Sequence, residues 1–408
     1  MSMDSGTPAA TLHQADLTGG VCATPGIAAA GVAVGLKPSG RPDLALVAAP
    51  GVVAAAAVQT RNQVKAHPVV LTARNVADGR ARAVLLNAGS ANVCTGPDGL
   101  ALAERSAVVA AEQLGCEPGD VLLCSTGVIG QPIPAAPLLE GIPRVVAALS
   151  PDGGSAAASA IMTTDTVPKE AAVRITDGDG GSCVVGGMAK GSGMIDPAMA
   201  TMLCVITTDA PIGGALLRAA LRRAVDRTFG RISVDGCMST NDAVLALATG
   251  SAEAAPSHAA FSVALTAVCQ RLAEAIVRDG EGATKLVRIT VSGARSEADA
   301  VALGRAIASS ALVKTAIAGE DPNWGRVLAA MGACPVPFEP DRVSIAFGGV
   351  TVCRFGVATS FDRGQAAAQL RGADVAISAD LGLGREAATF STCDLTHGYI
   401  TINADYTT

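Results

Sequence analysis

Apolar residues along the chain form short continuous runs that alternate with longer stretches of helical spacing. The continuous runs have the length of buried strands, and they cover residues 44–49, 52–58, 82–87, 121–124 and 202–207. The stretches with apolar residues three or four positions apart are typical of amphipathic helices, and they cover residues 100–114, 214–229, 261–277 and 298–311. The pattern therefore predicts alternating strands and helices over most of the chain.

Local signals predict how some of these elements are connected. Pro50-Gly51 separates two apolar runs and predicts two strands joined by a turn. Residues 171–187 alternate as a hairpin with its turn at 177–181. Residues 310–317 are expected to be a turn entering a strand. The polar sequence Ser-Thr-Asn-Asp at 239–242 is typical of a helix cap.

Composition limits the class of protein. A chain of 408 residues is too long for one ordinary core and predicts two or three lobes. Half of the residues are hydrophobic but only 2% are aromatic, so the core is expected to be aliphatic. The net charge of −6 and the absence of a Lys/Arg run argue against a nucleic-acid partner.

Cysteine and histidine usage indicates an intracellular protein without a structural metal. The eleven cysteines contain no C-x-x-C pair and mostly lie in apolar runs, as reduced thiols do. Four scattered histidines predict no zinc site. The first twenty residues lack the apolar region of a signal peptide, and the longest apolar run is too short to span a bilayer. We expect a cytoplasmic location.

The stretch from Met188 to Ala210 has the most unusual chemistry. A glycine-rich turn that carries Lys190 leads to Ala200-Thr201, and an apolar run follows at once. If the bond before Thr201 were cut, its free α-amine could act as a base near neutral pH and activate its own hydroxyl. The alternative is a glycine-rich turn before a core strand, and the residue types alone favour it.

Three other positions each allow a catalytic and a structural interpretation. Thr126-Gly127 follows a strand and could supply oxyanion donors or form an ordinary turn. The hydroxyl-rich stretch around Thr163 could bind a polar substrate or form a strand edge. Glu281 lies between two glycines, where its carboxylate could bind an amino group or be a loop charge.

The sequence resembles the ornithine acetyltransferase family, which is also called bifunctional glutamate N-acetyltransferase. The resemblance extends from about residue 22 to the end of the chain, and its motifs are KGSGMI at 190–195, MATML at 199–203, STGVIG at 125–130, VDGCMSTND at 234–242, DGEGATK at 279–285, GEDPNWGR at 319–326 and the terminal segment 393–408. We assign no catalytic residue within 319–326.

The resemblance implies the fold and the maturation of the chain. It implies an α/β fold of two lobes, with sheets packed between helices in an N-terminal-nucleophile-like arrangement of the family's own topology. It also implies self-cleavage between Ala200 and Thr201. The products would be an α chain, residues 1–200, and a β chain, residues 201–408, assembled as a heterotetramer with two copies of each.

The resemblance further implies acetyl transfer from N-acetyl-L-ornithine to L-glutamate through an acetyl-Thr201 intermediate. Thr126 and Gly127 would form the oxyanion hole. The substrate-binding residues implied by the family are Thr163, or its neighbour Thr164, together with Lys190, Thr201, Glu281, Asn403 and Thr408. No metal or organic cofactor is expected, and acetyl-CoA is left open as a second acetyl donor.

Other functions stay open at this point. The chain departs from the family pattern at His67, Ala88, Ser90 and Ala243, which leaves room for a related acyltransferase of secondary metabolism. A self-processing aminopeptidase or amidase would use the same threonine but transfer the acyl group to water. A non-catalytic binding protein of the same fold is the alternative from another class.

Overall fold

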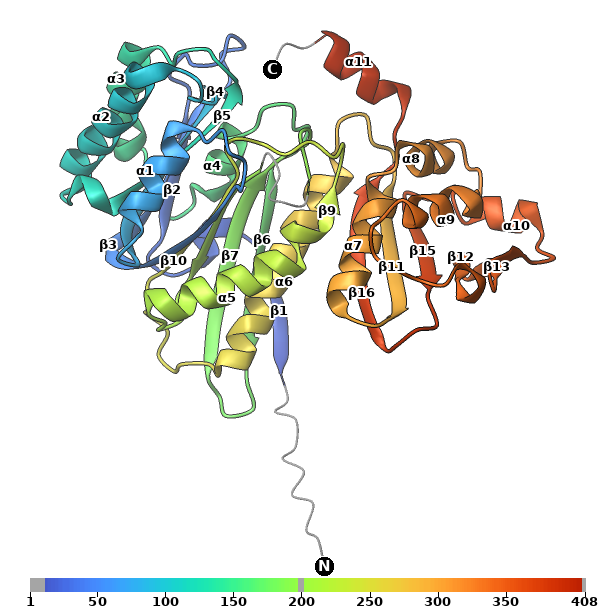
Figure 1. Ribbon diagram of the computed structural model, residues 1–408. Coiled ribbons are helices and arrows are strands. Elements are labelled where there is room, and N and C mark those ends of the chain that lie inside the picture. Colours follow the sequence, from blue (N-terminus) through green and yellow to red (C-terminus); the bar gives the residue numbers. More distant parts are fainter. Residues whose placement is uncertain (1–11, 197–201, 406–408) are drawn as a thin grey trace, which may run out of the picture.

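Two β-sheets organise the chain, and each is packed among helices (Figure 1). The structure is a computed structural model, and it describes residues 12–196 and 202–405. The sheets lie side by side in two lobes, with α11 (His397–Asp405) projecting from the second lobe toward the first (Figure 1). The predicted α/β fold with two lobes is confirmed.

The first lobe contains a nine-stranded sheet. The strand order is β1-β6-β7-β8-β10-β3-β4-β5, and β2 pairs with β3. The strands are β1 (His13–Leu17), β2 (Ala28–Val32), β3 (Leu44–Gln59), β4 (Arg80–Ser90), β5 (Val121–Val128), β6 (Lys169–Thr176), β7 (Ser182–Lys190), β8 (Leu203–Thr208) and β10 (Ala243–Ala248). The predicted hairpin is β6 and β7, which pair in antiparallel register.

β8 lies near the middle of this sheet and is buried on both faces. Cys204 and Ile206 belong to the core beneath α5 (Gly214–Arg227) and α6 (His258–Arg278). Leu203 and Val205 belong to the core on the opposite face, which includes α4 (Gly154–Ala160). Burial on both faces explains why the apolar run is continuous rather than alternating. The predicted buried strand directly after Thr201 is confirmed for residues 203–208.

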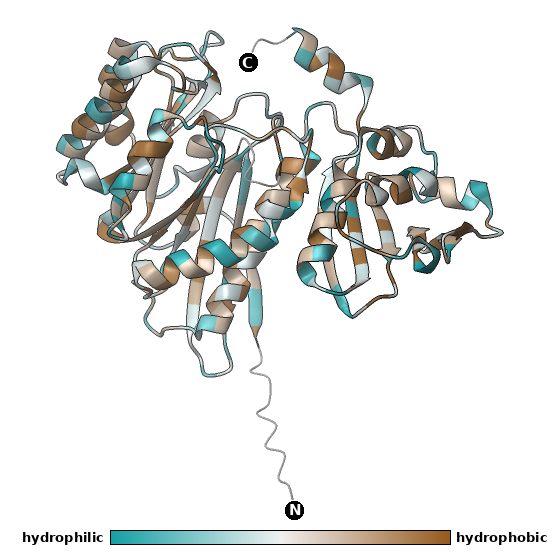
Figure 2. Ribbon diagram, in the orientation of Figure 1, coloured by the Kyte–Doolittle hydropathy of each residue, from teal (hydrophilic) through white to brown (hydrophobic). Residues whose placement is uncertain are grey.

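Three more helices cover the part of the sheet formed by β3, β4 and β5. They are α1 (His67–Asn75), α2 (Gly96–Leu114) and α3 (Ala135–Ala147). Apolar residues of α2 and α3 share one core with these strands. Figure 2 shows hydrophobic colour along the strands and patches of hydrophilic colour along the helices that cover them, as expected for amphipathic helices on a buried sheet.

The second lobe is built on a seven-stranded sheet. Its order is β14-β13-β12-β15-β11-β16-β9. The strands are β9 (Ile232–Ser233), β11 (Leu286–Ala294), β12 (Ser344–Phe347), β13 (Val350–Arg354), β14 (Val357–Ala358), β15 (Asp374–Asp380) and β16 (Glu386–Cys393), and the helices are α7 (Glu297–Ala308), α8 (Ala311–Ala318), α9 (Trp324–Gly332) and α10 (Arg363–Ala368). β15 alternates buried and exposed residues, so only one of its faces lies against the core.

The first sheet joins strands from both sides of Thr201. β7 precedes that residue, β8 follows it, and the two pair in antiparallel register. β10 also comes after Thr201 and pairs with β8 on its other edge. If the chain is cut before Thr201, the sheet therefore contains strands of both products. The division into 1–200 and 201–408 itself stays a prediction.

Three local predictions are wrong. β3 is one strand of 16 residues, because the ladder to β4 absorbs Pro50-Gly51 as a register shift between Ala48 and Val53 instead of turning back. The predicted turn and strand at 310–317 is α8, capped by the Ser310 hydroxyl. Residues 239–242 cap no helix and lead directly into β10.

Candidate active site

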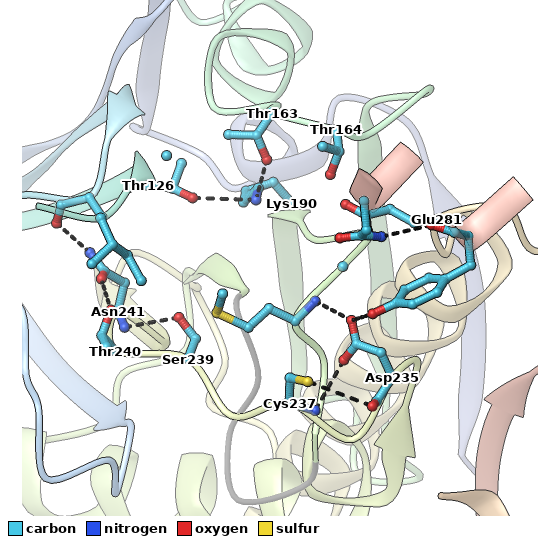
Figure 3. A pocket seen from close by; sticks show the side chains of 17 residues that line it. Thr126, Thr163, Thr164, Lys190, Asp235, Cys237, Ser239, Thr240, Asn241 and Glu281 are labelled. Carbon is cyan, nitrogen blue, oxygen red and sulfur yellow. Dashed lines mark hydrogen bonds between the residues drawn. The ribbon is translucent and has the colours of Figure 1, made fainter. Parts of the chain in front are cut away.

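The candidate site is a cavity of about 140 Å³ (Figure 3), and its lining includes Tyr399 and Asn403 of α11. Elements from both lobes line it. The lining residues are Ala91, Thr126, Gly127, Ile129, Thr163, Thr164, Lys190, Gly193, Met194, Asp235, Cys237, Ser239, Thr240, Asn241, Glu281, Tyr399 and Asn403. All predicted site residues that the structure describes are therefore brought to one cavity.

One wall of the cavity is built around Lys190, at the end of β7. Its ammonium donates to the Thr163 hydroxyl at 2.7 Å and to the Thr126 hydroxyl at 3.4 Å (Figure 3). The side chain is 2% exposed. Burial lowers the pKa of Lys190, and the nearby Asp165 carboxylate partly offsets this. The predicted Thr163 lies in the cavity, and so does its neighbour Thr164.

The contact with Lys190 determines that the Thr126 hydroxyl is free to act as a hydrogen-bond donor toward another group. An ammonium has only donors, so the Thr126 oxygen accepts from Lys190. The hydroxyl proton is then left to donate elsewhere, and this residue lines the cavity. A hydroxyl with this polarity suits an oxygen on which negative charge develops.

Gly127 has a conformation that only glycine adopts easily. Its φ is 128°, and a Cβ there would lie 2.3 Å from the backbone of Gly89 on the neighbouring strand β4. The close approach of β4 and β5 thus explains the glycine. A glycine is therefore required at this position for packing, independently of any role of its N–H in catalysis.

A second wall is acidic and is closed by the C-terminal helix. The Asn403 side chain of α11 donates to the Glu281 carboxylate at 2.8 Å. Thr396 donates to the carbonyl of Gly282 at 2.6 Å, and a Cβ on Gly282 would collide with the backbone at Tyr399. The terminal segment therefore packs on the loop that carries Glu281, as the prediction for Asn403 requires.

Asp235 is an acidic residue of this wall that the sequence interpretation did not single out. It accepts backbone N–H groups of Met194 at 2.6 Å and Ile195 at 2.9 Å, and the Tyr399 hydroxyl lies 3.4 Å away. Burial raises its pKa although these hydrogen bonds oppose the shift. Met194 has a φ of 56°, so Asp235 binds a left-handed residue that precedes the predicted scissile bond by six positions in the sequence.

A third wall comes from residues 239–241, which were interpreted as a helix cap. The Asn241 side chain donates to the carbonyls of Ala91 at 2.7 Å and Ser125 at 2.8 Å. It thereby fastens this loop to the strand that carries Thr126. The family motif in this segment was the available signal, but it gave no individual roles.

Ala200, Thr201 and Thr408 lie outside the described residues, and their predicted roles stay predictions. The neighbours of Thr201 can still be located. Leu203, two residues later, pairs with Lys190 on one side and with Ala243 on the other. The N–H of Met202 donates to a carboxylate oxygen of Asp242 at 3.0 Å. β8 thus begins between two segments whose residues line the cavity.

Comparison with known proteins decides the family. The profile of the ArgJ family matches residues 28–408. The chain belongs to the ArgJ family. It is 49% identical over 400 residues to the "Arginine biosynthesis bifunctional protein ArgJ" of Symbiobacterium thermophilum, covering 96% of this chain and 99% of that protein. The protein of the same name from Mycobacterium tuberculosis is 48% identical over 395 residues, 95% of this chain and 96% of the relative.

Solved structures of ArgJ proteins match about half of this chain. One is the ArgJ bifunctional protein of Bacillus halodurans, with 40% identity, a TM-score of 0.48, and 49% of this chain and 97% of that chain covered. Another is ornithine acetyltransferase of Mycobacterium tuberculosis in complex with ornithine, with 42% identity, a TM-score of 0.41, and 47% of this chain and 100% of that chain covered. The family suggested by the sequence motifs is confirmed by the ArgJ profile.

The range matched by the ArgJ profile, residues 28–408, includes every described residue that lines the cavity, from Ala91 to Asn403. The departure at Ala243 lies in β10, buried and outside the set of described residues that line the cavity. Within 12–196 and 202–405, no group of three or more His, Cys, Asp or Glu residues is arranged to hold a metal ion.

Proposed function

We propose that this chain transfers an acetyl group from N-acetyl-L-ornithine to L-glutamate in arginine biosynthesis, through an acetyl ester on Thr201. The observation that carries the proposal is the position of β8. It begins beside Lys190 and Asp242, at the cavity that holds Thr126, Gly127 and the other predicted site residues. The names of the ArgJ relatives and of the ornithine complex support the substrate class.

Maturation precedes catalysis in this proposal. The Thr201 hydroxyl attacks the carbonyl carbon of Ala200, the peptide C–N bond breaks, and the acyl group moves from nitrogen to oxygen. This shift frees the α-amine of Thr201. Water then hydrolyses the ester, which restores the Thr201 hydroxyl and leaves a carboxylate at Ala200. Met194 in the left-handed region, held by Asp235, supports a bent segment ahead of the scissile bond.

Acetyl transfer then follows a ping-pong course. The α-amine of Thr201 accepts the proton of its own hydroxyl, and the oxygen attacks the acetyl carbonyl of N-acetylornithine. Negative charge on the carbonyl oxygen is stabilised by the Thr126 hydroxyl and the Gly127 N–H. The amide C–N bond breaks, ornithine takes a proton and leaves, and an acetyl ester remains. The amine of glutamate attacks this ester and restores Thr201.

The charges of the cavity fit amino-acid substrates. Lys190 lies on one wall, where it suits a carboxylate, and Glu281 with Asp235 lies on another, where they suit an ammonium group. Thr163, Asn403 and Thr408 are the remaining proposed substrate contacts. Because both substrates are amino acids with carboxylate and amino groups, one cavity can serve both half-reactions.

Further parts of the proposal concern partners and location. The two products of cleavage would remain together, since strands from both sides of Thr201 share one sheet, and we propose an assembly with two copies of each. Acetyl-CoA is a candidate second acetyl donor, no metal or organic cofactor is needed, and the enzyme is expected in the cytoplasm.

Mass spectrometry after mixing the protein with N-acetylornithine tests the proposed function. One acetyl ester adds about 42 Da to the fragment that begins at Thr201, and added glutamate should remove it and yield N-acetylglutamate. Formation of the adduct followed only by release of acetate, or removal of the amino-terminal residue from peptides instead, would favour the aminopeptidase or amidase alternative. Transfer to another amine but not to glutamate would favour a secondary-metabolite acyltransferase.

Replacing Glu281 by glutamine is expected to weaken binding of N-acetylornithine. The change keeps the side-chain shape and a partner for Asn403 but removes the charge opposite an ammonium group. A charged hydrogen bond contributes about 1.5–3 kcal/mol, so KM should rise roughly 10–100-fold with kcat within a few-fold. Steady-state kinetics measures both, and Glu320→Gln, on the surface of the second lobe, is the matched control. A fall in kcat at unchanged KM would contradict this role.

A further inference from the structure

We propose that Lys169 is a positioning residue that holds Lys190 and the Glu281 loop in register through two buried carboxylates, Asp165 and Asp279. The proposal rests on the proposed function, because it concerns the same cavity. Lys169, Asp165 and Asp279 are not among the described residues that line the cavity. They lie behind its walls.

Lys169 connects two segments that are far apart in the sequence. Its ammonium lies 2.6 Å from an oxygen of Asp165 and 2.6 Å from an oxygen of Asp279. The Lys169 side chain is 1% exposed and those of the carboxylates are 0% and 7% exposed. A cation buried between two carboxylates is costly to disrupt, because removal of one partner leaves an uncompensated charge.

Asp165 carries the connection to the Lys190 wall. It accepts the N–H of Gly191 at 2.7 Å and the N–H of Thr163 at 3.0 Å, and its second oxygen lies 3.9 Å from the Lys190 ammonium. Burial alone would raise the pKa of Asp165, but Lys190 and Lys169 more than offset this and lower it to about 2. Asp165 is therefore an anion that both lysines share.

Asp279 carries the connection to the acidic wall. Its carboxylate accepts the N–H of Thr166 at 3.0 Å, and its carbonyl accepts the Ser192 hydroxyl at 2.6 Å. The N–H of Glu281 in turn donates to the carbonyl of Ser192 at 3.0 Å. The turn at 190–193 and the turn at 279–281 are thus fastened to each other and to Lys169.

This arrangement crosses the predicted cut. Asp165 and Lys169 precede Thr201, and Asp279 follows it, so the Lys169–Asp279 pair joins the two products of cleavage directly behind the cavity. It places Lys190 from one product and Glu281 from the other at a fixed separation. A substrate that spans both charges needs that separation to be maintained.

Loss of the Lys169 charge has a specific consequence for Lys190. The charged groups around the Lys190 ammonium are Asp165, Lys169, Glu281, Asp242 and, on the loop after β2, Lys37. Without Lys169, Asp165 keeps the N–H groups of Gly191 and Thr163, and Lys190, 3.9 Å away, remains as its ion-pair partner among the described residues. We expect the Lys190 ammonium to move from the two threonine hydroxyls toward Asp165, and its pKa to rise because a neighbouring positive charge is gone.

The test compares Lys169→Met, which keeps length and removes charge, with Lys169→Arg, which keeps the charge, and with wild type. We expect Lys169→Met to raise KM for N-acetylornithine at least about tenfold, with kcat changed less, and to shift the alkaline limb of the kcat/KM profile to higher pH. Lys169→Arg should bring KM back close to the wild-type value. Lys314→Met removes another buried lysine, in α8 and away from the cavity, and should lower thermal stability without changing KM or the pH profile.

A lower Tm for Lys169→Met with KM and pH profile like wild type would overturn the proposal and leave a structural role only. If Lys169→Met does not fold, Asp279→Asn breaks the same link from its other end. KM should again rise, but the alkaline limb should not move to higher pH, because the positive charge of Lys169 remains. NMR titration of the Lys190 ammonium is independent of turnover and should show a higher pKa in the Lys169 variant. If wild type transfers no acetyl group, the proposed function fails, while the titration still confirms or overturns the link between Lys169 and Lys190.

Discussion

Replacing Thr201 by alanine is expected to give a single uncut chain of 408 residues with no acetyl transfer. Alanine has no hydroxyl to attack the carbonyl of Ala200, so neither the acyl shift nor the later acetyl ester can form. Wild-type protein should appear instead as chains of 200 and 208 residues on denaturing electrophoresis. Loss of a covalent nucleophile lowers kcat by about 10⁴-fold or more.

Thr201→Ser is the matched control, because serine retains a hydroxyl and, after cleavage, an α-amine. We expect it to be cut at the same bond and to retain measurable transfer. N-terminal sequencing of the 208-residue fragment identifies the bond that is cut. Cleavage that persists in Thr201→Ala, or a wild-type amino terminus other than Thr201, would exclude self-cleavage by this residue.

The sequence predicted those elements whose apolar pattern is decided by burial alone. β8 is a continuous apolar run because it has a core on each face, and α6 shows helical spacing because it packs one face on the sheet. Pro50-Gly51 misled the interpretation because the ladder on either side of it tolerates a bulge. Ser310 was interpreted as part of a turn, although a serine hydroxyl also begins a helix, as it does in α8.

The site could be predicted only where a recognisable motif carried it. Thr126, Lys190 and Glu281 lay in such motifs and meet at one cavity. Asp235 lies in the motif at 234–242 and Asp165 in the hydroxyl-rich stretch around Thr163, yet both were missed because their roles come from contacts between distant segments. Asp235 accepts the backbone N–H of Met194, and Lys169 connects Asp165 with Asp279. Buried carboxylates of this kind have no local pattern, since nothing in the neighbouring sequence states which cation or N–H they meet.

Replacing Thr126 by valine should lower kcat by about 10²–10³-fold with a small effect on KM. Valine has nearly the same shape as threonine and favours a strand, so β5 should be retained. The lost hydroxyl is the one whose oxygen accepts from Lys190 and whose proton is left to donate into the cavity. Because the oxyanion exists only after attack, its stabilisation affects the chemical step more than substrate binding.

Thr126→Ser keeps the hydroxyl and should retain most of the activity, which separates loss of the donor from loss of packing. Gly127→Ala is a poor test of the second donor, because a Cβ would meet the backbone of Gly89 at 2.3 Å and disturb the β4–β5 ladder. Single-turnover acetylation, followed by mass spectrometry, measures the step directly. Equal rates in Thr126→Val and wild type, or a rise in KM with unchanged acetylation, would remove Thr126 from the oxyanion hole and leave it a substrate contact.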